Sequence, residues 1–433
     1  MLKKYFTSKT TYWGLIFTFF NGLSKLIQLL LIIYLGANLD EKNFGVFSLL
    51  ISFQFGVMTF GSAGINENLI TYMSKNQSDD LKLINSRTNS VFLIISLFAS
   101  IIFLLIYYFL NQINDFKYLI FFPISIGLIM SYSIYTSSAL KLEQKFIKAL
   151  FFGPMALIIL SSSMILTFVF KESLTYIFIS GFLSILFFIL LIIKIFNLSL
   201  NFINPLKIKE DLNYIFPFII IAIFGYLSGY GYNLISISFL SLEQIGIYSF
   251  LLTISTAPQI LSSSLISIYS PKFYKLYLNN NHTSALKSSN NFYFIIILSS
   301  FLISLIIVSI IFVSRYLEFP LNKYSEFYFY SSLILSGYLL AIPFWYNSMI
   351  IYIKKMNKEY MNSIILSGII GLIIWILLTY FFNENGLYIG FLLQVLIKSL
   401  LLEIYIPKEW KNKTIWLYTI ASVIILNIIT YIF

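Results

Sequence analysis

The sequence predicts an all-α integral membrane protein, with twelve or thirteen transmembrane helices in two six-helix bundles around a central cavity. Three observations carry this prediction: the composition, a series of long apolar segments, and the spacing of the basic residues. The chain is 59% hydrophobic and only 10% charged, far from the composition of a soluble domain. Its apolar runs are also too long and too continuous for the alternating strands of a membrane β-barrel.

Each apolar segment is long enough to cross a hydrocarbon core of roughly 30 Å, which needs about 20 residues of helix. In chain order, we predict membrane helices at residues 11–35, 44–71, 90–110, 118–140, 149–170, 173–196, 214–240, 245–270, 291–314, 327–353, 359–382 and 386–407. A weaker thirteenth segment covers 414–433. The gaps between the segments are too short to hold a soluble domain.

Basic residues are concentrated in every second gap between these segments. Three lysines or arginines precede the first segment, and three follow each of the even-numbered segments. The alternate gaps hold only Lys42, Lys117, Lys171, Arg315 and Lys323. Because basic residues favour cytoplasmic loops, we expect a multi-pass protein of the cytoplasmic (inner) membrane with a cytoplasmic N-terminus. The same pattern accounts for the net charge of +11, so we expect no nucleic acid partner.

Two short segments in the two halves of the chain resemble each other at a shift of 201 residues. Residues 39–52 (LDEKNFGVFSLLIS) align with residues 240–253 (LSLEQIGIYSFLLT), and Gly45 then matches Gly246. The shift spans six predicted helices, and an even number preserves the orientation of each helix in the membrane. The sequence therefore predicts a parallel repeat of two six-helix bundles, with chance similarity as the alternative.

The repeat and a polar connector define the predicted domains. We predict an N-terminal bundle at 1–196, a cytoplasmic connector at 197–213, a C-terminal bundle at 214–407 and an extra C-terminal helix within 408–433. Bundles related by an axis normal to the membrane leave a central cavity between them. Such proteins usually expose that cavity to one side of the membrane at a time.

Lys25 is the most informative polar residue, because it lies deep within the first predicted helix. It is roughly 21 Å from one end of the helix and about 15 Å from the other, which is too far for its side chain to reach either interface. A charge at this depth costs at least about 2.5–3.5 kcal/mol. We therefore expect Lys25 to bind substrate in a cavity, with a structural salt bridge as the alternative. Asn21 and Gln28 lie on the same helical face and extend a polar stripe.

The second half of the chain supplies three further candidates for substrate binding. Lys398 lies near the middle of the twelfth predicted helix, where it faces the cavity or extends to the cytoplasmic interface. Tyr230 and Asn233 lie in the seventh predicted helix. Tyrosine rings can stack on sugars, while ordinary packing is the alternative for both residues.

Three residues are candidates for gating or coupling. Glu67 ends the second predicted helix near its cytoplasmic side, where it closes a gate or caps the helix. Pro258 and Pro343 interrupt the eighth and tenth predicted helices. A proline in a membrane helix frees a carbonyl group and permits a kink, so these are candidate hinges.

The sequence lacks the groups that metal, nucleotide or covalent catalysis needs. It has no cysteine, a single histidine (His282) and no GxxxxGK[ST] loop for a nucleotide. Its five aspartates all lie in predicted loops, without an Asp-x-Asp pair. We therefore predict no catalytic residue, no metal site and no cofactor, and leave coupling to H⁺ or Na⁺ open.

Several stretches resemble Wzx-type polysaccharide flippases, the O-antigen and capsule repeat-unit transporters of the multidrug/oligosaccharidyl-lipid/polysaccharide exporter superfamily. The similar stretches are 21–53, 60–75 (FGSAGINENLITYMSK), 233–276 and 385–406 (NGLYIGFLLQVLIKSLLLEIYI). The similarity spans most of the chain, and the count of twelve helices fits the superfamily. Drug exporters and peptidoglycan-precursor flippases share these patterns, so they indicate the superfamily better than the substrate.

The resemblance implies that undecaprenyl-diphosphate-linked oligosaccharide moves from the inner to the outer leaflet. The sugar would cross through the central cavity while the lipid tail stays in the bilayer, and Lys25 would contact the diphosphate. Expected partners are the lipid-linked oligosaccharide, the phospholipid bilayer, a polysaccharide polymerase and a chain-length regulator. Family members often carry an acid at the position of Asn233, which puts ion coupling through this position in doubt.

The expected function is therefore that of a non-enzymatic flippase for surface polysaccharide, working by alternating access. An ion-coupled drug antiporter and a peptidoglycan-precursor flippase are alternatives within the superfamily, but a cationic cavity argues against cationic drugs. A membrane polysaccharide polymerase or ligase is the alternative from another class. Such an enzyme would need a large external loop with acid and base residues, and the external gaps here are short.

The topology can be tested by labelling single cysteines, because the chain has no cysteine of its own. Cysteines near the basic gaps should react only after the inner face is opened, at Lys75, Lys148, Lys207, Lys275 and Lys355. Cysteines in the other gaps should react from outside, near Asp40, Asp115, Lys171, Glu243 and Glu318. Reversed labelling at several of these sites would contradict the predicted orientation.

Overall fold

The computed structural model describes residues 8–63, 81–109, 121–142, 145–156, 158, 205–278, 282–316, 321–354 and 356–432. Within these ranges the regular secondary structure is entirely helical, without a strand, so the predicted all-α class is confirmed. Six described segments are long and apolar enough to cross a membrane: Glu41–Ser62, Leu242–Ile266, Ser284–Val313, Asn322–Lys354, Lys358–Ile404 and Lys413–Ile432. The chain is a multi-pass membrane protein. Most of the predicted helices at 149–170 and 173–196 lies outside the described residues.

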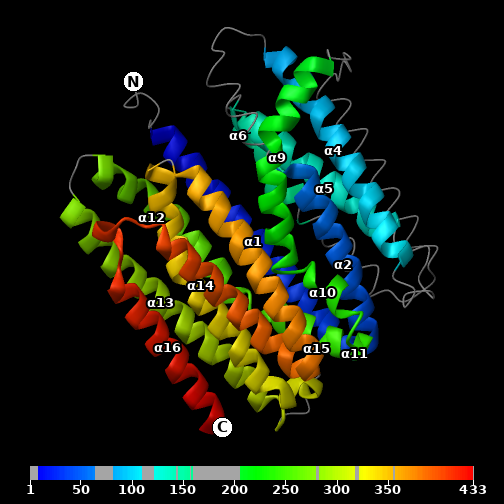
Figure 1. The fold of residues 1–433 in the computed structure, drawn as a ribbon, viewed down its shortest axis with the longest axis vertical. Coiled ribbons are helices and arrows are strands. Elements are labelled where there is room, and N and C mark those ends of the chain that lie inside the picture. Colours follow the sequence, from blue (N-terminus) through cyan, green and yellow to red (C-terminus); the bar gives the residue numbers. More distant parts are fainter. Residues whose placement is uncertain are drawn as a thin grey trace. The chain divides into compact units, whose positions relative to one another are not determined.

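The chain divides into two compact units. Unit 1 consists of Met1–Leu31 and Val46–Gly231, and unit 2 of Ile32–Gly45 and Tyr232–Phe433. Unit 1 contains most of α1 (Ser8–Asn38) and of α2 (Glu41–Ser62), with α4 (Leu81–Phe109), α5 (Phe121–Leu142), α6 (Phe146–Leu150), the π-helical turn η3 (Phe151–Met155) and α9 (Pro205–Leu227) (Figure 1).

Unit 2 contains the end of α1, the start of α2 and the rest of the chain. Its own elements are α10 (Tyr232–Ser236), α11 (Leu242–Ile254), α12 (Ala257–Leu278), α13 (His282–Val313), the 3-10 turn η4 (Asn322–Phe327), α14 (Tyr328–Lys354), α15 (Asn357–Ile404), the 3-10 turn η5 (Lys408–Trp410) and α16 (Lys413–Ile432).

The placement of α9 in unit 1 follows from the contacts of Tyr226. Its hydroxyl donates to the backbone oxygen of Ser52 on α2 over 2.8 Å, and its ring packs edge-on against Phe103 of α4 at 5.6 Å. Gly56 leaves the room that the Phe103 ring fills. The two compact units are thus divided at Gly231. The sequence instead places the boundary between the two bundles in the connector 197–213, and this boundary stays a prediction.

The internal repeat recurs in local structure at the start of two helices. Asp40 caps α2, because its Oδ1 accepts a hydrogen bond of 2.8 Å from the backbone N–H of Asn43. Ser241 caps α11, because its Oγ accepts one of 3.3 Å from the backbone N–H of Gln244. A shift of 201 residues converts the first pair into the second. Both copies therefore begin a helix with the same cap.

The same correspondence holds further along each helix. The Ser52 hydroxyl donates to the backbone oxygen of Ser48 over 2.9 Å, and the Thr253 hydroxyl donates to that of Ser249 over 2.7 Å. These pairs are again related by 201 residues. Matched hydrogen bonds of this kind support a true repeat over a chance similarity.

α15 is two membrane helices joined by a reversal. At about 1.5 Å per residue, a single helix of its 48 residues would be more than twice as long as the hydrocarbon core of a bilayer is thick. The reversal occurs at Asn383, whose φ of 51° lies in a region that asparagine tolerates better than most residues. The limbs pack antiparallel, and the Trp375 indole N–H donates to the Leu387 oxygen over 2.8 Å. The predicted helices 359–382 and 386–407 are confirmed.

The C-terminal segment forms a helix of its own. α16 lies alongside α13 and α14, and its red ribbon follows them in Figure 1. The side-chain amide of Asn427 donates to Ser336 Oγ over 2.8 Å, and Ser332 donates to Asn427 Oδ1 over 3.1 Å. One amide thus joins α16 to two hydroxyls of α14, where no water can take its place.

Replacing Asn427 with alanine should weaken the attachment of α16. Interhelical hydrogen bonds in membranes contribute about 0.6 kcal/mol each and up to about 1.7 kcal/mol, so losing two should lower the unfolding temperature in detergent. Ile428→Ala is the matched control, because Ile428 is 53% exposed. An equal or larger effect of the control variant on the unfolding temperature would contradict this role.

Candidate functional site

The polar stripe of α1 lies in unit 1. Lys25 is exposed, whereas its neighbour Ser24 is buried, so the lysine lies on the face of α1 that does not pack inside the unit. Gln28, half-buried, takes part in a polar interaction. The side chain of Asn21 lies outside the described residues. Within the described ranges, no carboxylate forms an ion pair with Lys25, and the salt-bridge alternative finds no partner there.

Tyr230 follows α9 in a glycine-rich turn, where the N–H groups of Gly229 and Gly231 both donate to the Tyr226 oxygen over 3.0 Å. Its ring stacks on Phe55 of α2, with centroids 4.5 Å apart and planes 10° from parallel. Both side chains are half-buried. The pair is an aromatic surface of unit 1 that suits the apolar face of a sugar ring.

Asn233 lies in α10, in unit 2, and is fully buried at 0% exposure. It takes part in a polar interaction. Asn233 and Tyr230 are thus close in sequence but differ in surroundings, since one is enclosed in packing and the other is half-exposed.

Lys398 lies over an aromatic ring in unit 2. Its Nζ is 4.6 Å from the ring centroid of Phe344, which follows Pro343 in α14. The next residue, Ser399, donates its hydroxyl to the backbone oxygen of Leu340 over 2.7 Å. The structure therefore brings two predicted candidates together, a cation and a helix-interrupting proline, and joins their helices by a hydrogen bond.

The two prolines occupy different positions in their helices. Pro343 is buried inside α14, which stays helical around it although a proline provides no N–H to the backbone ladder. Pro258 is the second residue of α12, and the helix is interrupted between Ile254, the end of α11, and Ala257, the start of α12. A proline in the first turn costs no hydrogen bond, so Pro258 fits a helix start. Glu67 lies outside the described residues.

A carboxylate network near the end of α15 was not among the sequence predictions. Glu403 Oε2 accepts hydrogen bonds from the Asn347 side-chain amide over 2.5 Å and from the Trp416 indole over 3.3 Å. An acid in the last turn opposes the helix dipole, and these neutral donors stabilise it there. The network joins α14, α15 and α16. The composition of helix ends could have flagged Glu403, but not its partners.

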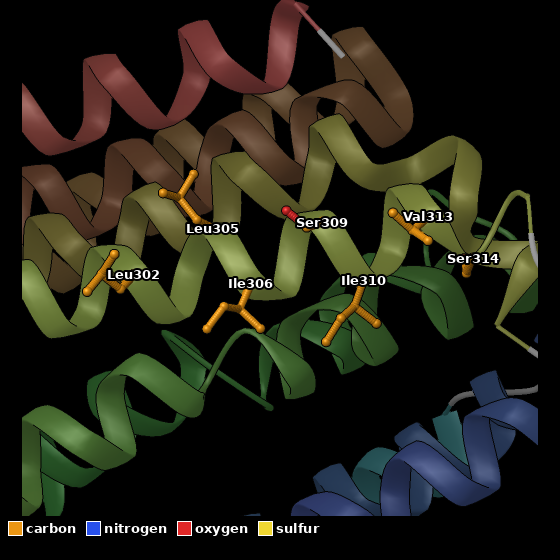
Figure 2. A pocket seen from close by; sticks show the side chains of 7 residues that line it. All are labelled: Leu302, Leu305, Ile306, Ser309, Ile310, Val313 and Ser314. Atoms are coloured by element: carbon orange, nitrogen blue, oxygen red, sulfur yellow. The ribbon is translucent and has the colours of Figure 1, made fainter.

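A groove of about 670 Å³ follows one side of α13. Figure 2 shows Leu302, Ile306 and Ile310 projecting from the same side of the helix. Its lining is completed by Leu305, Ser309, Val313 and Ser314. With no charged residue in its lining, this groove suits hydrocarbon chains and could not neutralise a phosphate.

Residues 14–276 match the model of a family described as polysaccharide biosynthesis protein. The match covers more than half of the chain. The chain belongs to this polysaccharide biosynthesis protein family. No curated protein matches the chain.

Solved structures similar to this family member include several transporters. One is an inward-facing multidrug resistance MATE family transporter of the MOP superfamily, at a TM-score of 0.47 and 11% identity over 95% of this chain and 94% of that chain. Another is a MATE transporter in the straight conformation, at a TM-score of 0.48 and 13% identity over 96% of both chains. A third is the eukaryotic MATE transporter AtDTX14, at a TM-score of 0.45 and 14% identity over 96% of this chain and 98% of that chain.

Substitutions at the junction of α14 and α15 should separate packing from charge. Burying an ammonium group costs about 2.5–3.5 kcal/mol on insertion scales, more than the roughly 0.5–2 kcal/mol that a cation–π contact returns. Lys398→Met keeps the stem without the charge, so it should leave the unfolding temperature unchanged or raise it. Ser399→Ala should lower it, because an interhelical hydrogen bond is lost. If Lys398→Met destabilises more than Ser399→Ala, the ammonium group over Phe344 itself contributes to stability.

Proposed function

We propose that this family member is a flippase, which carries undecaprenyl-diphosphate-linked oligosaccharide units from the inner to the outer leaflet of the cytoplasmic membrane. The units would supply surface polysaccharide such as O-antigen or capsule. The observation that carries the proposal is Lys25, a cation at predicted membrane depth, which lies exposed on α1 without a carboxylate partner in the described ranges. The family description, polysaccharide biosynthesis protein, supports the class of product.

A lysine at this depth suits a diphosphate for electrostatic reasons. The insertion cost of a lone cation falls when an anion with several oxygens approaches it, because the Coulomb attraction is larger where water is scarce. Lys398 gives unit 2 a cation at depth as well, and its contact with Phe344 is one that an anionic headgroup could replace. Tyr230 and Phe55 offer stacking surface to the sugar.

The mechanism we propose is alternating access without chemistry on the substrate. The N-terminus is cytoplasmic in this proposal, and the lipid tail stays in the bilayer while the sugar crosses. No residue acts as a catalyst, and movement of H⁺ or Na⁺ is the candidate driving force. The polymerase and chain-length regulator that act on the delivered units are the proposed protein partners.

The proposal is tested with purified protein in liposomes. The protein should move lipid-linked oligosaccharide across the bilayer without ATP, and mass spectrometry should find the product chemically unchanged. A lengthened or cleaved glycan would show an enzyme. Transport of the peptidoglycan precursor but not of the surface-polysaccharide unit would assign the chain to the other class of lipid-linked substrate.

Lys25 variants test the observation that carries the proposal. Lys25→Ala should reduce the flipping rate roughly ten- to a hundredfold, because this factor corresponds to the free energy that one hydrogen bond to a charged group contributes. Lys25→Arg should retain part of the activity, since charge survives but geometry changes, and Lys25→Glu should be worse than alanine because it repels phosphate.

The matched control is Lys358→Ala, which removes an exposed lysine outside the stripe. It should leave the flipping rate unchanged. Membrane-protein level and flipping rate are measured together for all variants. Full activity of folded Lys25→Ala would remove this lysine from the site, and loss of folded protein restored by a charge-swapped partner would make it structural.

A further inference from the structure

The two glycines that the internal repeat aligns meet inside unit 2. A Cβ added to Gly45 would overlap the carbonyl oxygen of Leu242, and a Cβ added to Gly246 would overlap that of Glu41. A shift of 201 residues converts Gly45 into Gly246 and Glu41 into Leu242. The two contacts are therefore one contact made twice, in the reciprocal pattern that a two-fold axis produces.

At this crossing, backbone meets backbone. The first turns of α2 and α11 approach so closely that a carbonyl oxygen of each lies where a side chain of the other would begin. Only glycine permits such an approach, which small residues provide throughout membrane proteins. At the glycines themselves only backbone atoms meet, and beside them the rings of Phe44 and Phe250 pack edge-on, with centroids 5.7 Å apart.

Two residues of η4 hold the adjoining end of α1. Lys323 donates from Nζ to the backbone oxygen of Leu39, and the Tyr324 hydroxyl donates to that of Gly36 over 3.1 Å. The last carbonyls of a helix lack partners within it and carry partial negative charge, so a lysine and a hydroxyl both suit them. The Tyr324 ring also stacks on Phe250 of α11, with centroids 3.9 Å apart.

All these contacts lie on one predicted side of the membrane. The gap between the first two predicted helices and the gap that holds Lys323 are both expected to be external. Lys323 is one of the few basic residues in the external gaps, and its bond to the end of α1 gives it a local role there.

We propose that the crossing at Gly45 and Gly246, held by Lys323 and Tyr324, closes the protein at its outer face and separates when that face opens. This inference rests on the proposed flippase function, because only a transporter needs the outer face to open and close. The bonds at η4 end on backbone oxygens and can be exchanged for bonds to water, so the closure is reversible.

The closure is tested with a buried reporter thiol. Ser249→Cys is near-isosteric, is only 4% exposed as serine, and lies one turn beyond Gly246 in a chain without cysteine. In this background, Gly45→Ala or Gly246→Ala should raise the rate of labelling from outside by a membrane-impermeant maleimide roughly tenfold, since overpacking favours the separated state. The double variant should label only slightly faster than either single variant, because both glycines belong to the same contact.

Gly225→Ala is the matched control, because a Cβ there meets no atom within 4 Å. Its labelling rate should equal that of the reporter alone. Tyr324→Phe and Lys323→Met loosen the same closure without overpacking, so they provide the test if the glycine variants do not fold. Each should raise labelling by a smaller factor. Unchanged labelling in folded glycine variants, or in both η4 variants, overturns the closure.

A second measurement separates this inference from the proposed function. The glycine variants should also move less lipid-linked oligosaccharide in liposomes, because one of the two states is disfavoured. Raised labelling with undiminished flipping would overturn the role in transport. If the reporter responds as expected but the unmodified chain moves no lipid-linked sugar, the flippase function fails while the crossing stands. If the chain flips and the reporter never responds, only the closure fails.

Discussion

Inside a bilayer, no water is present to satisfy a polar group, and this constraint shapes both units. Polar side chains therefore find partners on neighbouring helices, and some of these are backbone oxygens, as when Tyr226 donates to Ser52 or Ser399 to Leu340. Each contributes only about 0.6 kcal/mol on average, but each fixes which helix faces which. Apolar helix surfaces have little preference for one another over lipid, so these polar contacts determine which helices pack together. The attachment of α9 to α2 through Tyr226 is one clear result.

The glycines divide into two kinds by what they face. Gly56 faces an aromatic ring, Phe103, and such a site resembles a core position in which knob and hole fit each other. Gly45 and Gly246 each face a backbone carbonyl group of the other helix. The first kind gives a unit its fixed packing. The second kind suits a contact that forms and breaks, which is why the repeat-related pair can serve a transporter while the other serves stability.

The charged side chains of the membrane helices have different surroundings. Glu403 accepts hydrogen bonds from two neutral donors, and its role in joining α14, α15 and α16 needs no ligand. Lys398 lies over Phe344 but has no carboxylate beside it in the described ranges, and Lys25 is exposed on α1. Packing gains little from either lysine. A substrate with a diphosphate would repay their insertion cost, and this physical argument links the fold to the proposed function.

The sequence by itself determined features that are local along the chain: the all-α membrane class, the break between helices at 383–385 and the alignment of Gly45 with Gly246. The length of apolar segments and a short-range similarity between two segments can both be read directly from the order of the residues. Only the tertiary structure decided that Lys398 lies over Phe344 and that the aligned glycines meet each other. Apolar helix faces are nearly equivalent in hydrocarbon, so a pattern along one helix predicts that a face will pack but not which helix it meets.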